Sequence, residues 1–255
     1  MPKQILVIVE GEADEVKFLR ALFKNCYRKA DYKVYSYKTN IHVLAQELYN
    51  NYPDFDEDET DIKLVLASLE TNQDKRKKLL EKYTDVFLIF DFDPQHDHPH
   101  FDTVRRMLKY FDDSTAQGKL FVNYPMMQSY KHFPLLPDDD YADRIVSMEQ
   151  IYEYKKLVGI ESAFTDLNHY TYITFYSLAI HHLKKANKIL TGIYSLPTLN
   201  GYYRFDFVEI FDKQLDMIES DNKVYVLNTC IFALVDFAPT RFYKFLKQHM
   251  DELDV

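Results

Sequence analysis

The sequence predicts an α/β fold, with a parallel sheet in its first half and a mainly helical second half. Short aliphatic runs, typical of buried strands, alternate with helical segments over residues 1–125. Beyond residue 134 this alternation stops and helical patterns dominate. The turn-rich, acidic segment PLLPDDDYAD lies where the pattern changes. We therefore expect a parallel-sheet, Rossmann-like domain over residues 1–135 and a mainly helical domain over residues 136–255.

The elements of the first half follow from the spacing of its apolar residues. Strands are predicted at residues 4–9, 33–38, 86–90 and 120–124, and helices at residues 13–29, 41–50 and roughly 101–112. Residues 62–83 are less regular, because IKLVLASL fits either the end of a strand or the start of a helix, whereas DKRKKLLEKY predicts a helix. Alternation of strands and helices favours helices on both faces of the sheet.

The second half carries several helix signals. A capping-box spacing predicts helix starts at Ser147 with Gln150 and at Asp206 with Glu209. Residues 172–190 predict a long helix, and a last one is expected over roughly 239–250, with Pro239 in the favoured first turn.

Composition indicates an ordinary folded protein. The chain has 255 residues, of which 47% are hydrophobic and 28% charged. No apolar run approaches the roughly 18 residues of a membrane helix, and the start MPKQILVIVE does not resemble a signal peptide. Cys26 and Cys230 share no motif, so neither a disulfide framework nor a zinc site is expected. We expect a cytoplasmic protein without a membrane partner.

The net charge of −9 argues against a surface that binds nucleic acid everywhere. Residues 52–61 carry much of this charge and are interpreted as a solvated loop. A local basic stripe is predicted on the first helix, formed by Lys17, Arg20, Lys24 and Arg28. It fits equally a nucleic-acid contact or a solvated helix face. A second basic segment, over residues 181–188, suits the end of its helix or a phosphate contact.

Acidic residues end two of the predicted strands. Glu10 follows ILVIV, and Asp91 and Asp93 follow VFLIF. Ligands of parallel α/β sheets gather at the carboxyl ends of strands, so neighbouring strands would bring these acids into one place. Such a cluster is unfavourable without a positive charge, and oxygen ligands select Mg²⁺ or Mn²⁺. We expect a magnesium site suited to phosphodiester chemistry.

These residues resemble the TOPRIM (topoisomerase–primase) pattern. Its features are a strand ending in Glu-Gly, an acid a few positions later, a helix, and a strand ending in Asp-x-Asp; VEGEADEVKFL is similar to the form in nucleases of the overcoming-lysogenization-defect (OLD) kind. The match covers about the first half of the chain. The resemblance implies that Glu10 is a general acid/base or metal ligand, Asp91 and Asp93 are metal ligands, and Asp14 is a candidate ligand for a second metal.

Three alternatives stay open. Gln95 and His96 replace the glycine-containing turn usual after Asp-x-Asp, and Gln128 stands where some OLD-like nucleases have a glutamate, which favours a degenerate regulatory or nucleic-acid-binding protein. A phosphatase of the haloacid-dehalogenase kind would use Asp91 and Asp93 and leave Glu10 unexplained. The acids can also simply cap the helices that follow.

The expected function is metal-dependent cleavage of DNA or RNA, in defence against foreign nucleic acid. No GxxxxGK[ST] phosphate loop is present, so an ATPase of the kind that accompanies OLD-like nucleases would be a separate partner. A homodimer is a further state compatible with the sequence. The histidines of residues 96–100 lack zinc spacing and are interpreted as solvated loop residues.

Overall fold

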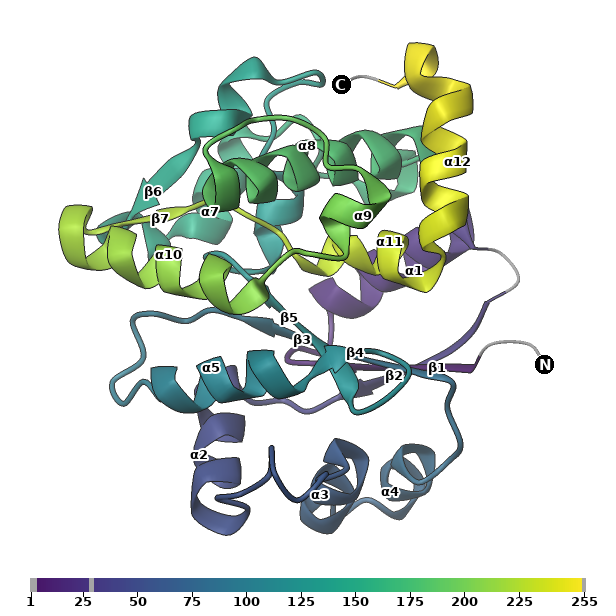
Figure 1. The fold of residues 1–255 in the computed structure, drawn as a ribbon, viewed down its shortest axis with the longest axis vertical. Helices are drawn as coiled ribbons and strands as arrows, with labels where there is room; N and C mark the ends of the chain where they lie inside the picture. The colour runs from purple at the N-terminus through teal and green to yellow at the C-terminus, as the bar shows by residue number, and fades with distance from the viewer. Residues whose placement is uncertain (1–3, 28–29, 254–255) are drawn as a thin grey trace. The chain divides into compact units, whose positions relative to one another are not determined.

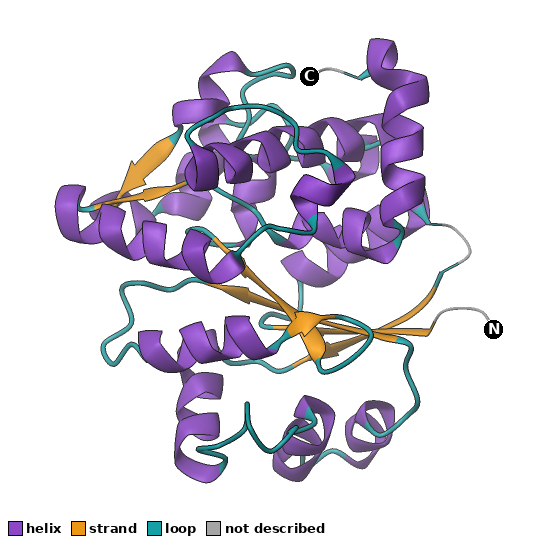
Figure 2. Cartoon of the chain, in the orientation of Figure 1, coloured by secondary structure: helices purple, strands orange, loops and turns teal. Residues whose placement is uncertain are grey.

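Five strands pair in the order β2-β1-β3-β5-β4 in the computed structural model of the chain, and they appear in orange in Figure 2. The strands are β1 (Gln4–Val9), β2 (Asp31–Ser36), β3 (Asp85–Asp91), β4 (Asp112–Asp113) and β5 (Gly118–Asn123). β1 pairs in parallel with both β2 and β3, whereas the short β4 pairs antiparallel with β5. The α/β class with a mostly parallel sheet is therefore confirmed.

The structure describes residues 4–27 and 30–253, and the chain divides into two compact units. Unit 1 comprises Met1–Lys17 and Arg28–Val122, and unit 2 comprises Phe18–Tyr27 and Asn123–Val255. These units do not coincide with the predicted division at residue 135. The change falls at the end of β5 because Asn123 already binds within unit 2, where its side-chain oxygen accepts the Cys230 N–H at 3.2 Å.

The central strands are buried on both of their faces. Residues 5–9 of β1 and residues 87–90 of β3 are at most 1% exposed. Their sequences are accordingly continuous apolar runs rather than alternating ones. Polar side chains return only where these strands end, at Glu10 and Asp91.

Four helices of unit 1 lie on one side of the sheet (Figure 1). They are α2 (Ile41–Asn51), α3 (Ile62–Leu69), α4 (Gln73–Leu79) and α5 (Phe101–Tyr110). The ambiguous segment at residues 62–69 is thus a helix. Asp61 caps it by accepting the Lys63 N–H at 2.8 Å, and Ile62, Val65 and Leu66 are buried at helical spacing.

Helix α1 (Asp14–Cys26) has an apolar face and a basic face, as expected. Phe18, Leu19, Leu22, Phe23 and Cys26 are buried, whereas Val16 is only half-buried. Lys17, Arg20 and Lys24 are exposed, and none of them forms an ion pair with a residue that the structure describes. Arg28, the fourth member of the predicted stripe, lies outside the described residues.

Unit 2 is mainly helical and also contains a small antiparallel pair of strands that the sequence did not predict. Its helices from residue 148 onward are α6 (Met148–Ile151), α7 (Tyr154–Glu161), α8 (Tyr172–Thr191), α9 (Leu199–Tyr202), α10 (Phe207–Asp221), α11 (Ala233–Phe237) and α12 (Pro239–His249). The strands are β6 (Ile145–Ser147) and β7 (Lys223–Tyr225). Ser147 and Gln150 form the predicted capping box, and Pro239 opens α12.

The two histidines and Lys185 in the basic segment of α8 are internal, so for these three residues the interpretation as a phosphate contact is wrong. His181, His182 and Lys185 are at most 3% exposed. The Lys185 ammonium donates to the backbone oxygens of Tyr141, at 3.1 Å, and of Arg144. Burial lowers the pKa of Lys185 well below its usual value. These side chains stabilise the interior of unit 2 and do not present charge to a ligand.

None of the described helices combines the length and the apolar character needed to cross a membrane.

Candidate active site

The backbone of Glu10 is fixed on both sides by the neighbouring strands. Its N–H donates to the oxygen of Ile89, two residues before the end of β3, at 3.2 Å. Its own oxygen accepts the Lys38 N–H, just beyond β2, at 2.9 Å. Glu10 therefore continues the parallel pairing of β1 by one residue, and its side chain leaves the sheet at the carboxyl edge.

The side chain of Glu10 meets the end of β3. Its carboxylate oxygen Oε2 accepts the N–H of Asp91, the last residue of β3, at 3.1 Å. Asp93 follows two residues later, and all three acids are half-buried. The predicted adjacency of Glu10 with the Asp-x-Asp strand end is thus confirmed, because β1 and β3 are direct neighbours.

A fourth acid, Glu15, belongs to this group and was not predicted from the sequence. Glu15 lies in the first turn of α1 and is only 8% exposed. Its carboxylate folds back over Gly11, so that a Cβ at position 11 would lie 2.5 Å from Glu15 Oε2. The absence of a side chain at Gly11 thus makes room for a second carboxylate beside Glu10. Asp14, the predicted second-metal ligand, is half-buried in the same turn.

Burial and crowding of the carboxylates change their acidity. Burial, the charge of Asp93 and the charge of Glu15 raise the pKa of Glu10 to about 8, against a smaller opposing effect of the Asp91 N–H. Burial also raises the pKa of Asp93, whereas Gln95 and His96 oppose that change. Negative charge is therefore costly at this edge of the sheet unless a proton or a cation offsets it.

His42 of α2 holds the loop that carries Asp93. Its Nδ1 accepts the His100 N–H at 3.2 Å, so Nε2 carries the proton. Nε2 donates to the backbone oxygens of Phe92 and Asp93, at 3.2 and 3.1 Å. Burial lowers the pKa of His42 to about 4, which keeps the ring neutral. Asp93 itself has a φ of +44°, a left-handed conformation that these hydrogen bonds help to maintain.

Both missed residues left a signal in the sequence. Glu15 precedes Phe18, Leu19 and Leu22 by three, four and seven positions, so it occupies the apolar face of its helix. A carboxylate in that position faces inward. His42 directly follows Ile41, the first buried residue of α2, so it stands in the first turn of an amphipathic helix at the start of its apolar face.

The donor atoms at this edge have the chemistry that a hard cation requires. Gln95 donates to Asp93 Oδ1 at 3.4 Å, and its buried oxygen Oε1 has no hydrogen-bond partner among the described residues. Carboxylate and amide oxygens are suitable Mg²⁺ ligands. Within residues 4–27 and 30–253, however, no three His, Cys, Asp or Glu side chains converge as a ready-made metal site. The donor chemistry thus fits magnesium, while the side chains would have to close around the ion.

Comparison of the chain with models of known protein families, with curated proteins and with solved structures gives no match. The site is therefore interpreted from its own geometry. Its defining features are three carboxylates from two adjacent strand ends, a fourth from the first turn of α1, and a neutral histidine that positions the loop of Asp93.

Replacing His42 by Ala is expected to lower the free energy of unfolding by roughly 2–3 kcal/mol, because it leaves the oxygens of Phe92 and Asp93 and the N–H of His100 without their partner. Urea denaturation at neutral pH measures this change. His98→Ala is the matched control, since His98 is exposed in the same loop region. Equal stabilities of the two variants would show that His42 does not hold the loop.

Proposed function

We propose that the chain is a magnesium- or manganese-dependent phosphodiesterase of the TOPRIM kind, cleaving DNA or RNA at the edge formed by Glu10, Asp91 and Asp93. The observation that carries the proposal is the hydrogen bond of 3.1 Å from the Asp91 N–H to Glu10 Oε2, which ties the two acidic strand ends together. Acids that merely cap helices do not require two separate strand ends to meet. The phosphatase alternative would leave this contact without a role.

The contacts at the site suggest a role for each of its residues. A bound divalent cation would neutralise and orient the phosphodiester, with Asp91, Asp93 and the Gln95 oxygen as the residues to hold it. Glu10 Oε2 is engaged by the Asp91 N–H, which leaves Oε1 to exchange a proton with the reacting oxygen. Glu15 adds negative charge beside Glu10 and favours the protonated carboxyl. His42 fixes the loop in which Asp93 stands.

A degenerate TOPRIM protein that binds nucleic acid without cleaving it is the second candidate. It is favoured by the lack, among the described residues, of a preformed set of three metal ligands. The two candidates differ in one respect that can be measured. The first turns substrate over when a divalent cation is present, and the second only binds it.

The test is a cleavage screen with supercoiled DNA, transfer RNA and ribosomal RNA as substrates, in Mg²⁺ or Mn²⁺. Cleavage of any of them by wild type, and its loss in Glu10→Ala, is the result the proposal predicts. Binding without cleavage on every substrate would replace it by the degenerate alternative. We include in the same proposal a role in defence against foreign nucleic acid and cooperation with a separate ATPase. The identity of the substrate that is cleaved would help to test both of these roles.

Charge reversal at Arg20 and Lys24 is expected to weaken nucleic-acid binding and to flatten its salt dependence by roughly one log–log unit per lost phosphate contact. Both side chains are exposed on α1, away from its buried face. The affinity is measured by fluorescence anisotropy over a series of salt concentrations. Arg76→Glu/Lys77→Glu is the control, because it makes the same change of charge at exposed positions of α4. An unchanged salt slope in Arg20→Glu/Lys24→Glu would leave the stripe a solvated helix face.

A further inference from the structure

A groove in unit 2 combines an apolar floor with a basic rim. It has a volume of about 700 Å³ and runs between residues 196–200 and helix α12. This volume lies within the range of roughly 300–1,000 Å³ typical of small-molecule sites. Its lining residues are Leu196, Pro197, Thr198, Leu199, Asn200, Thr240, Tyr243, Lys244, Leu246, Lys247 and Met250.

The apolar side chains of the groove are recessed rather than protruding. Pro197 and Leu246 are buried, and Leu196 and Leu199 are half-buried. Met250, at 43% exposure, is the large apolar side chain that stands most open to solvent among the described lining residues. A protein partner needs a broad exposed apolar surface. A recessed apolar surface suits a narrow aliphatic group that inserts into the groove.

The charge of the groove is one-sided. Lys244 and Lys247 lie one turn apart on the same side of α12, and both are exposed. Neither forms an ion pair with a described residue, and the lining contains no carboxylate. Two adjacent ammonium groups beside an apolar floor are complementary to one anionic head attached to an apolar tail.

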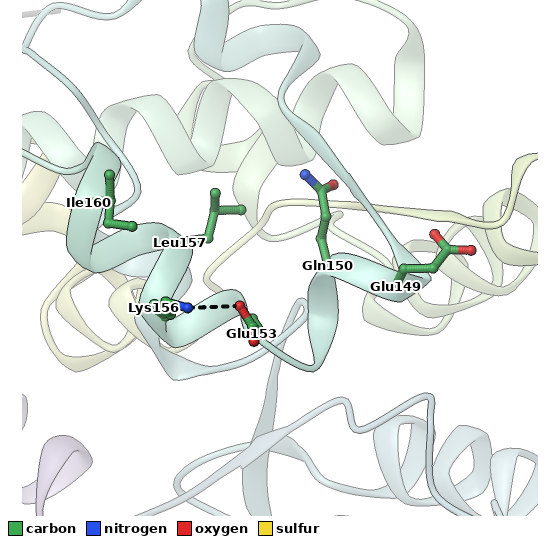
Figure 3. A pocket seen from close by; sticks show the side chains of 6 residues that line it. All are labelled: Glu149, Gln150, Glu153, Lys156, Leu157 and Ile160. Atoms are coloured by element: carbon green, nitrogen blue, oxygen red, sulfur yellow. Dashed lines mark hydrogen bonds and ion pairs between the residues drawn. The ribbon is translucent and has the colours of Figure 1, made fainter.

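A second hollow in unit 2 provides a contrast. It lies beside α6 and α7, has a volume of about 410 Å³, and is shown in Figure 3. There Lys156 pairs with Glu153 at 3.2 Å, and Glu149 adds a further carboxylate. Its cation is neutralised, so this hollow offers no attraction to an anion. Of these two hollows, the groove beside α12 is the one whose described lysines form no ion pair.

We infer that the groove between residues 196–200 and α12 binds a small amphipathic anion, with an aliphatic tail on Leu196, Leu199 and Leu246 and an anionic head at Lys244 and Lys247. This site shares no residue with the proposed cleavage site, because every lining residue belongs to unit 2 and Glu10 belongs to unit 1.

Calorimetric titration of the full chain with decanoate tests the inference. One saturable site is expected, with roughly tenfold weaker binding in Lys244→Gln/Lys247→Gln, the loss that two partly exposed ion pairs would give. Decyltrimethylammonium, which has the same tail and the opposite charge, is expected not to bind. Leu199→Asp should also weaken decanoate binding, because it places a carboxylate in the path of the tail and repels the anionic head.

The control variant Lys77→Gln/Lys213→Gln removes the same charge at exposed positions of α4 and α10 and should bind decanoate as wild type does. Glu10→Ala should also leave decanoate binding unchanged, which separates failure of this inference from failure of the proposed cleavage. Absence of a saturable site, equal binding of both probes, or equal loss in the two lysine pairs would each overturn the inference.

Discussion

Replacing Glu10 by Gln is expected to lower the rate of metal-dependent phosphodiester cleavage by on the order of 10²–10⁴-fold, the usual contribution of a general acid or base. The amide keeps the shape of the side chain and an oxygen that accepts the Asp91 N–H, but it cannot exchange a proton at neutral pH. Single-turnover cleavage with enzyme in excess measures the chemical step separately from substrate binding.

The matched control for that measurement is Glu12→Gln. Glu12 lies two residues further along the same loop, is exposed, and pairs with Lys38 at 2.7 Å. The Glu12→Gln variant should cleave at a rate within about twofold of that of wild type, since removal of a surface ion pair has little effect. Comparable losses in the two variants would mean that the loop, and not the Glu10 carboxyl, matters for catalysis.

The stability of the protein should depend on pH through Glu10. Its pKa is about 8 in the folded chain and 4.5 in the reference state, so between these values the folded chain binds more protons than the unfolded one. The stabilisation by this proton is complete below pH 4.5 and is lost as the pH rises through 8. His42 acts in the opposite sense between 4 and 6.5, because its pKa is lowered in the folded chain.

Between pH 6.5 and 8 the stability should change through Glu10 and not through His42. The free energy of unfolding should fall through Glu10 by on the order of 2 kcal/mol over this range. Urea denaturation of wild type and Glu10→Gln across this window measures it. The difference between the two proteins isolates Glu10 from other buried groups, such as Lys185, whose pKa burial also shifts. Wild type should lose stability relative to Glu10→Gln as the pH rises. A constant difference would show that the Glu10 carboxyl is not held in a proton-favouring environment.

The same denaturation measurements can be repeated in millimolar Mg²⁺. A cation bound beside Glu10 favours its ionised form, so it should reduce the loss of stability with pH in wild type. The same concentration should have no such effect in Glu10→Gln, which has no carboxyl to ionise at that position.

The carboxyl edge of the sheet was the most predictable part of the molecule. The apolar runs before Glu10 and Asp91 are long and continuous, because both faces of β1 and β3 are buried. Short-range pattern was therefore enough to place two strand ends. That they are neighbours depended on the pairing of β1 with β3, which only the structure supplies.

Physical reasons explain the features that the sequence left open, misassigned or did not reveal. The segment at residues 62–69 is apolar almost throughout, so its periodicity did not distinguish strand from helix, and the Asp61 cap was the deciding feature. Lysines usually remain in solvent, yet Lys185 is enclosed by backbone oxygens contributed by residues some forty positions away. The β6–β7 pair consists of two three-residue strands far apart in the chain, which leave too little local pattern to recognise.

At the site, too, local sequence pattern was not enough to predict the polar residues that face inward. Glu15 and His42 lie on or next to helix faces that look like ordinary core. The Glu15 carboxylate occupies the space that a side chain at Gly11 would fill, and His42 donates to the loop after β3. A pattern of apolar spacing identifies the face that is buried. It does not identify which polar side chain on that face forms a hydrogen bond or contact with another element.

The central claim is that Asp91 and Asp93 hold a divalent cation beside Glu10, and direct measurement of Mn²⁺ binding by electron paramagnetic resonance tests it most closely. Wild type should remove Mn²⁺ from the free signal in competition with Mg²⁺, and Asp91→Asn/Asp93→Asn should lose that binding. Asp97→Asn, an exposed acid a few residues further on, should bind as wild type does. Equal Mn²⁺ binding by wild type and Asp91→Asn/Asp93→Asn, or none by wild type, would contradict the account.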